Sequence, residues 1–280
     1  MPLPFVNAGS ARSLWPVSNL TGTAMSAPAV PLLPETQALI TRFTTPPTYG
    51  RAVLINSLIG SLIAAGVWSK LDTLYVMAAA DAQAAQQNWL QNAYNLTPAN
   101  APTFVTDRGY AGNGTTSYLD TGWAPGTNGV NYALNNASLG VWNRTERVAN
   151  GMALMGATTA SGASVFPMFT GDLCFTRITD GGGSVPTTGS SGFIIGVRTA
   201  AGSRTTYRNG SSLGVVAVAS GSLNAVSFFI CGQSAGGVLN ASSASTDQAS
   251  AAFTGGTLSA GEVTSFYVAM LAYLQGVGAA

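Results

Sequence analysis

The chain has 280 residues, of which 11 Lys or Arg and 10 Asp or Glu are charged, so that charged residues make up 8% of the sequence and the net charge is +1. Soluble proteins usually contain about 25% charged residues, and a nearly neutral chain has no strong electrostatic attraction to nucleic acid, anionic membranes or acidic substrates. Histidine is absent, which excludes Ser-His-Asp and Cys-His nucleophiles, histidine metal sites and an imidazole switch near neutral pH.

Residues 1–36 are predicted to form an extended, proline-rich docking arm. Their prolines are spaced so that neither a helix nor a strand of useful length can form. The apolar residues between the prolines are too numerous for an idle linker, so we expect the arm to lie on its own domain or on a neighbouring subunit. The first residues lack a secretory signal, and we expect the chain to fold in a cytoplasm. The apolar residues of the arm are Phe5, Leu14, Trp15, Val17, Leu20, Leu32 and Leu33.

Residues 37–100 are predicted to be a helical region. Between Arg51 and Lys70 lie 18 uncharged residues, whose leucines and isoleucines recur on one half of a helix. The pattern indicates an amphipathic helix, and a membrane span is the alternative because the length is near the minimum for crossing a bilayer. The other expected elements are short helices at 36–43 and 80–92 and a strand at 71–77.

Residues 101–280 are predicted to form an antiparallel β-sandwich that ends in a helix, which makes the chain mainly β. Apolar residues make up 46% of the chain and it has 34 glycines, as short strands joined by tight turns require. Asn209-Gly210 can supply both positive-φ positions of a type I′ hairpin. Ser259 and Glu262 form a capping-box motif before an apolar stripe, which predicts an amphipathic helix at about 259–276. Strands are expected at 103–106, 117–121, 131–143, 152–157, 165–170, 173–179, 192–199, 204–208, 212–219, 225–231 and 251–254.

The two cysteines lie within these strand-like runs. Cys174 stands in Gly-Asp-Leu-Cys-Phe and Cys231 in Phe-Phe-Ile-Cys-Gly. Free cysteine is among the most often buried residue types. We predict two buried free thiols, with a disulfide as the alternative.

An ordered set of short motifs runs through most of the chain. Together these motifs resemble those of bacteriophage and gene-transfer-agent structural proteins of the spike or fibre type, whose main domain is a concanavalin A-like, laminin-G-like jelly-roll sandwich. The resemblance covers roughly residues 38–278, and the arm before it matches no motif of that family. At position 80 we expect the relatives to carry His, whereas this chain has Ala80. The motifs are Ala38–Pro47, Arg51–Ile59, Gly66–Asp72, Ala80–Trp89, Tyr94–Pro98, Asp107–Tyr110, Gly112–Gly122, Tyr207–Gly210 and Leu258–Val263, with Tyr273-Leu274 at the end.

The resemblance implies a non-enzymatic virion protein, such as a head spike, a fibre base or a tail appendage. Such a protein would dock on other virion proteins through its N-terminal arm and present the lectin-like sandwich, with binding to host capsular polysaccharide as a further expectation. We also expect a homo-oligomer in a phage-like particle made in the bacterial cytoplasm. The low charge of the chain leads us to expect neither nucleic acid nor a membrane as a partner. Two alternatives stay open: a purely architectural virion protein without a ligand, and a glycan-cleaving depolymerase.

Five residues are candidates for carbohydrate binding. Trp142 and Arg144 share one face of a strand by the period of two, and a Trp beside an Arg can stack a sugar ring and hold its hydroxyls. Arg198, Tyr207 and Arg208 near the hairpin are the other candidates, and a structural role is the alternative for all five. Calcium, which the resemblance brings into consideration, needs six to eight oxygens. Because the carboxylates are scattered singly, we predict no metal site, no catalytic pair and no cofactor.

Overall fold

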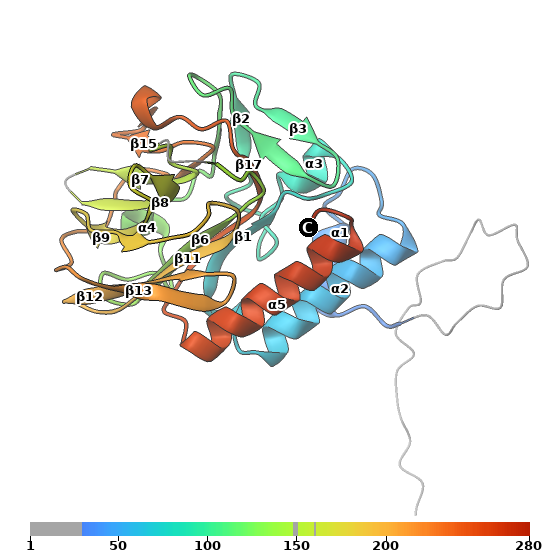
Figure 1. Cartoon of the computed structure of the whole chain (residues 1–280). Helices are drawn as coiled ribbons and strands as arrows, with labels where there is room; N and C mark the ends of the chain where they lie inside the picture. Colours follow the sequence, from blue (N-terminus) through green and yellow to red (C-terminus); the bar gives the residue numbers. More distant parts are fainter. Residues whose placement is uncertain (1–29, 148–150, 160) are drawn as a thin grey trace, which may run out of the picture.

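The computed structural model describes residues 30–147, 151–159 and 161–280. Within them the chain forms two sheets packed as a sandwich, with a layer of helices on the outer face of one sheet (Figure 1). All strand pairs are antiparallel except β15 with β7. The predicted class, a mainly β antiparallel sandwich, is confirmed. Predictions for residues 1–29 lie outside the described residues.

The first sheet, sheet A, is the middle layer of the molecule. One of its faces packs on the helices and the other on the second sheet. In spatial order it contains β13 (Ser211–Ala217), β12 (Ser203–Arg208), β11 (Gly192–Ala200), β6 (Ala137–Asn143), β17 (Gln248–Gly255), β4 (Gly109–Ala111) and β3 (Thr103–Val105), and β1 (Leu71–Val76) pairs with β17 beside β4.

Sheet B is the outer layer. Its strands in spatial order are β10 (Val185–Pro186), β9 (Leu173–Asp180), β8 (Gly162–Phe169), β7 (Met155–Thr158), β14 (Phe229–Ile230), β5 (Tyr118–Asp120) and β2 (Thr97–Ala99), with β15 (Ser234–Ala235) and β16 (Val238–Leu239) attached through β7.

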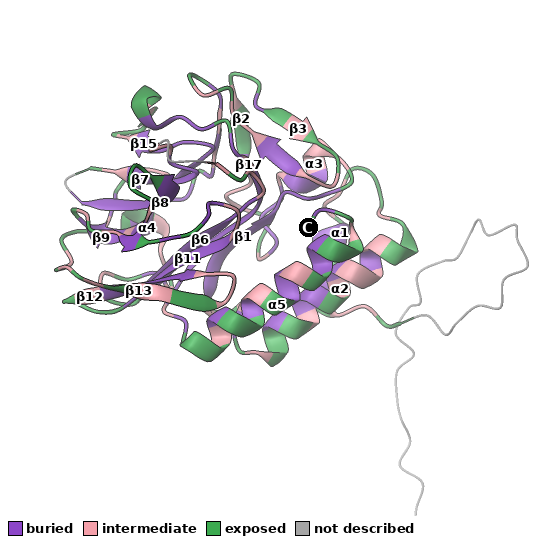
Figure 2. Cartoon of the chain, in the orientation of Figure 1, coloured by how far each residue is buried: buried purple, intermediate pink, exposed green. Residues whose placement is uncertain are grey.

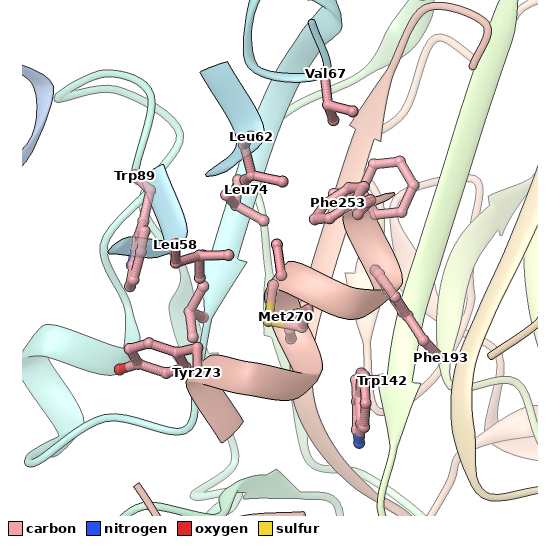
Figure 3. Packing of buried hydrophobic residues seen from close by; sticks show 14 of the residues in the cluster. Leu58, Leu62, Val67, Leu74, Trp89, Trp142, Phe193, Phe253, Met270 and Tyr273 are labelled. Carbon is pink, nitrogen blue, oxygen red and sulfur yellow. The ribbon is translucent and has the colours of Figure 1, made fainter. Parts of the chain in front are cut away.

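Two long helices cover the outer face of sheet A, and shorter ones occupy the connections. Figure 3 shows Met270 of α5 among Leu58 and Leu62 of α2 and Leu74 and Phe253 of sheet A, and Figure 2 shows that the outward faces of both helices are exposed. The helices are α1 (Pro34–Ile40), α2 (Tyr49–Ala64), α3 (Ala82–Ala85), α4 (Pro125–Asn128) and α5 (Ala260–Gly276), with 3₁₀ turns η1 (Trp68–Lys70) and η2 (Ala241–Ser243).

Local sequence signals account for how the two long helices begin and end. The Thr48 hydroxyl accepts from the Arg51 amide at the start of α2, and Gly66 at φ +70° follows its end. The predicted capping box between Ser259 and Glu262 opens α5. The apolar stripe of α2 faces sheet A, although Ile63 is 40% exposed. None of the helices in the described ranges is long and apolar enough to be a membrane span.

The predicted helix at 80–92 is wrong beyond Ala85. The buried Asn88 forms a bridge with Tyr75, and its Oδ1 accepts from the amides of Leu74 and Leu90. This side chain therefore replaces helical hydrogen bonds and fixes the segment to the edge of β1.

Other strand boundaries also differ from prediction, and the longest difference is in the run at 131–143. Only 137–143 is a strand, because the amides of Val130, Asn131 and Tyr132 all donate to the Asp72 carboxylate. The run at 225–231 shortens to β14. Asn209 (φ +51°) and Gly210 (φ +78°) form the predicted hairpin turn between β12 and β13.

The predicted regions do not divide the fold into separate units. Residues 37–100 contain helices, but also β1 of sheet A and β2 of sheet B. The arm predicted at 1–36 overlaps α1, which begins at Pro34, and the Leu33 amide and the Thr36 hydroxyl both donate to Asn56 Oδ1. Residues 30–100 are therefore built into the same body as the sandwich.

Candidate functional site

The five predicted site residues do not come together. Trp142 and Arg144 share a face as expected, but it is the face of sheet A that α5 covers. Trp142 is only 6% exposed, and its ring stacks on Tyr267 of α5 with centroids 5.9 Å apart and planes 10° apart. Because Tyr267 already occupies that position, Trp142 is not available to a sugar. Arg144 donates to the Ala279 carbonyl and to Gln248 Oε1, each at 2.6 Å, and burial lowers the pKa of Arg144.

The other three predicted residues are also in structural positions. Tyr207 is 9% exposed and belongs to the core under the helices. Arg198 is fully buried and donates to Asp180 Oδ2, which also accepts from Arg204. Arg208 donates to the carbonyls of Gly189 and Ser191 and to the Thr187 hydroxyl. These contacts agree with the alternative interpretation of the three residues, which is a structural role in the core and the turns.

A cavity of about 200 Å³ lies between the start of α2, the end of β1 and the last turns of α5. We call it the α2–α5 cavity. Its walls are mostly apolar, with aromatic rings from three separate segments, and such a lining is typical of sites that bind by shape and apolar contact. It is lined by Phe43, Thr45, Pro46, Pro47, Thr48, Arg51, Ile55, Val76, Ala79, Ala80, Asp81, Ala84, Trp89 and Tyr273.

The fold places the aromatic walls through buried contacts. Trp89 and Tyr273 are each 3% exposed, and their rings meet edge to face with centroids 5.8 Å apart (Figure 3). The Tyr273 hydroxyl donates to the Ala78 carbonyl at 3.1 Å. Trp89 Nε1 is buried and has no hydrogen-bond partner, and Figure 3 shows the nitrogen end of its ring on the side of Tyr273. The cavity wall thus contains an unused N–H donor.

Arg51 and Asp81 are the charged residues of the lining. Arg51 Nη2 lies 2.6 Å from Asp107 Oδ1. Burial opposes the charge of Arg51, but Tyr273 and Asp107 outweigh burial and raise the pKa of Arg51. Asp81 caps α3 by accepting from the Ala84 amide, and no ion-pair partner of Asp81 occurs in the described part of the chain.

A second, more open groove of about 380 Å³ shares Trp89 with the cavity. It runs beside α1, and polar side chains line its edges. Its lining residues are Pro34, Glu35, Ala38, Arg42, Trp68, Trp89, Leu90, Gln91 and Asn92.

A glycosidase needs two carboxyl groups across the scissile bond, and the lining of the α2–α5 cavity contains one, Asp81. Among the described residues no three His, Cys, Asp or Glu side chains are grouped so as to hold a metal ion.

Reasoning from the sequence did not identify this cavity. Its walls come from segments that are far apart in the chain, and Trp89 was expected to be on a helix. The one usable signal was the clustering of the resemblance motifs at 38–47, 51–59 and 80–89, each of which contributes lining residues.

Comparisons with known proteins add structural likenesses but no family. The scan of family models found no match, and neither did the search of curated proteins. Among solved structures, the chain is similar to the binding domain of Paraclostridial Mosquitocidal Protein 1, with 13% sequence identity and a TM-score of 0.49 over 71% of this chain and 52% of that one. It is similar to Trypanosoma rangeli sialidase in complex with 2,3-difluorosialic acid, with 12% identity and a TM-score of 0.48 over 78% of this chain and 39% of that one. It is also similar to the botulinum neurotoxin serotype D binding domain, with 10% identity and a TM-score of 0.45 over 71% of this chain and 52% of that one. The chain thus spans about half or less of each of these structures.

Proposed function

We propose that the protein is a non-enzymatic structural component of a phage or phage-like particle, such as a head spike, a fibre base or a tail appendage. Its helical side, together with the N-terminal segment, docks on other virion proteins, and sheet B faces outward. The motif set at 38–122 supports this assignment by resemblance. Because the surface has few charges, copies of the chain repel one another weakly, and this suits a homo-oligomer in a crowded particle.

The observation that carries the proposal is the polarity of the fold. The described chain begins at Val30, whose amide donates to the Tyr49 hydroxyl of α2 at 2.9 Å. The first described residues therefore lie on the helical side, and sheet A separates them from sheet B (Figure 1). Docking through the helices leaves the whole outer sheet free for presentation.

Deleting residues 1–29 tests the docking role. The deletion stops at residue 29 rather than at residue 36, the predicted end of the arm, because Leu33 and Thr36 are hydrogen-bonded to Asn56. We expect the shortened protein to stay folded, by circular dichroism and thermal melting, but to be missing from purified particles by quantitative mass spectrometry. Particles that carry the shortened protein in wild-type amounts would overturn the docking assignment, and particles that lack the full-length protein would overturn the virion assignment.

Binding of host-surface polysaccharide stays a prediction. A surface rich in hydroxyls and amides favours it, but Trp142 and Arg198 are buried, so a sugar would have to contact other side chains. A glycan array with the full chain tests this prediction, and the absence of any bound glycan would favour the purely architectural alternative. For the depolymerase alternative, the assay is the release of reducing ends or unsaturated sugars from capsular polysaccharide.

A further inference from the structure

We propose that the α2–α5 cavity binds a small, uncharged molecule that combines one ring-sized apolar body with a carbonyl oxygen, as an aromatic or alicyclic amide does. The carbonyl oxygen accepts a hydrogen bond from Trp89 Nε1, and the apolar body lies against the surrounding rings and aliphatic side chains. All residues that line this site belong to the described part of the chain. The site does not depend on the virion assignment.

The first observation is a pair of buried hydrogen-bond donors in the cavity lining. Trp89 is 3% exposed, and its Nε1 has no hydrogen-bond partner. Arg51 Nη1 is likewise buried without a hydrogen-bond partner, whereas Nη2 of the same guanidinium is held by Asp107. A buried donor left unpaired costs free energy, which an acceptor recovers. Because Trp89 and Arg51 line the same cavity, this cavity favours a ligand that brings an acceptor oxygen.

The second observation is the size and the lining of the cavity. Its volume is about 200 Å³, and an apolar cavity of about 150 Å³ is enough for benzene. Ile55, Val76 and Ala79 supply aliphatic wall, and Trp89 and Tyr273 supply rings. Water can hydrogen-bond to the two donors but gains nothing from these walls, whereas a ring removes them from water. One six-membered ring with a short polar group therefore matches the space.

The third observation is the charge of the lining. Its charged side chains are Arg51 and Asp81, and Asp107 already compensates Arg51. Asp81 caps α3 but has no ion-pair partner among the residues that the structure describes. An anion in the cavity would meet this carboxylate, and the charge of Arg51 is already offset. The lining therefore favours an uncharged carbonyl compound over a carboxylate.

Benzamide is the probe that tests this proposal, and toluene is the probe that keeps the ring but has no acceptor. We expect benzamide to bind the full-length protein with a dissociation constant of about 1 mM, a usual affinity for a ligand of this size. Toluene should bind about tenfold more weakly, because it leaves the Trp89 donor unpaired. The readout is the indole N–H resonance of Trp89 in proton–nitrogen NMR spectra, which Trp89→Phe identifies by its disappearance. Benzamide should shift this resonance until the site is saturated.

A matched pair of tryptophan variants tests the donor. Trp89→Phe keeps an aromatic ring but removes the N–H, and in calorimetric titrations it should weaken benzamide about tenfold while leaving toluene nearly unchanged. Trp123→Phe is the control, because Trp123 is also buried with an unpartnered Nε1 but packs on Tyr132 and Phe228, outside the cavity lining. It should change neither affinity. Thermal melting confirms that both variants are folded.

Variants of the lining test the place and the charge preference. Ala80→Phe fills the cavity from an exposed lining position and should abolish binding of both probes. Ala260→Phe adds the same bulk at an exposed position at the first residue of α5 and should not. The wild type should bind benzoate more weakly than benzamide, and Asp81→Asn, which keeps the helix cap, should bring the two affinities together.

Three outcomes overturn the proposal. The first is equal affinity of the wild type for benzamide and toluene. The second is binding of benzamide that Ala80→Phe leaves unchanged. The third is a Trp89 resonance that benzamide does not shift at about tenfold the expected dissociation constant, which would mean that the cavity holds water only.

Discussion

At the scale of single residues, Asp180 has the largest predicted effect on stability. Its Oδ2 accepts from Arg198 Nη2 and from Arg204 Nε, each at 2.8 Å, and all three side chains are fully buried. Without the carboxylate, two guanidinium groups lie between the sheets without their counter-charge. We expect Asp180→Asn to lower the free energy of unfolding by about 3–5 kcal/mol, measured by urea denaturation.

Asp172→Asn is the matched control for this substitution. Asp172 is exposed and lies at φ +54°, a conformation that Asn accepts readily. The control should change the free energy of unfolding by less than about 0.5 kcal/mol. An Asp180→Asn protein as stable as the Asp172→Asn protein would show that the carboxylate is not what holds the two arginines.

The cysteines give a second prediction at this scale. Both thiols are free and buried, as predicted, and burial raises the pKa of Cys174 and of Cys231 to about 12. Because the thiolate is the reactive species, we expect neither residue of the folded protein to react with iodoacetamide at pH 8. Both should react in urea, where the pKa returns to about 8.5. Mass spectrometry of the alkylated protein checks this, and rapid labelling of either thiol in the folded state would contradict it.

At the scale of elements, the start of α5 couples a local motif to a contact with a distant part of the chain. Glu262 completes the capping box and also forms an ion pair with Lys70, whose Nζ lies 2.6 Å from Glu262 Oε1. Burial alone would raise the pKa of Glu262, but hydrogen bonds from Lys70 and Ser259 outweigh burial and hold that pKa below its usual 4.5. The ion pair therefore joins the helical layer to the start of β1 while Glu262 is ionised.

This coupling predicts how the stability of α5 depends on pH. Glu262→Gln keeps the capping geometry and should lower the free energy of unfolding at pH 7 by about 0.5–1 kcal/mol, because the pair is partly exposed. The contribution is present above pH 4.5 and is lost as pH falls through the lowered pKa of the folded protein. Denaturation curves at pH 7 and pH 3 check this. Glu35→Gln, which removes a carboxylate that has no ion-pair partner in the described residues, is the control, and a difference that persists at pH 3 contradicts the assignment.

At the scale of the whole molecule, the helical region predicted at 37–100 and the sandwich form one body within the described residues. β1 pairs along β17 from Leu71↔Gly255 to Val76↔Ala251, and α2 packs against α5. A fragment of residues 101–280 exposes that edge of β17 and the apolar face of α5. We expect it to melt without a cooperative transition, whereas residues 30–280 should melt cooperatively. Calorimetry of the two fragments tests this prediction. A cooperative transition in the fragment of residues 101–280 would contradict it and would support a domain boundary at residue 100.

Local sequence patterns were sufficient to predict the class of the fold and many of its elements. The capping box, the apolar stripe of α2 and the Asn209-Gly210 turn are formed by residues that are neighbours in the chain. The alternation of apolar residues also gave the strands β9, β11 and β12 nearly to the residue. Local pattern failed where a side chain, rather than the backbone, accepted the hydrogen bonds of backbone amides. Asn88 ended the predicted helix at 80–92, and Asp72 bound the amides of residues 130–132.

The sequence by itself thus determined a nearly neutral, histidine-free chain with a β-sandwich and two amphipathic helices. Only the tertiary structure decided which residues are accessible. Trp142 and Arg198 had the residue types of a binding site, but α5 covers Trp142 and sheet B covers Arg198. Trp89, Arg51 and Tyr273 line one cavity although long stretches of sequence separate them. Burial and the convergence of distant segments depend on how the layers pack, and no local periodicity contains that information.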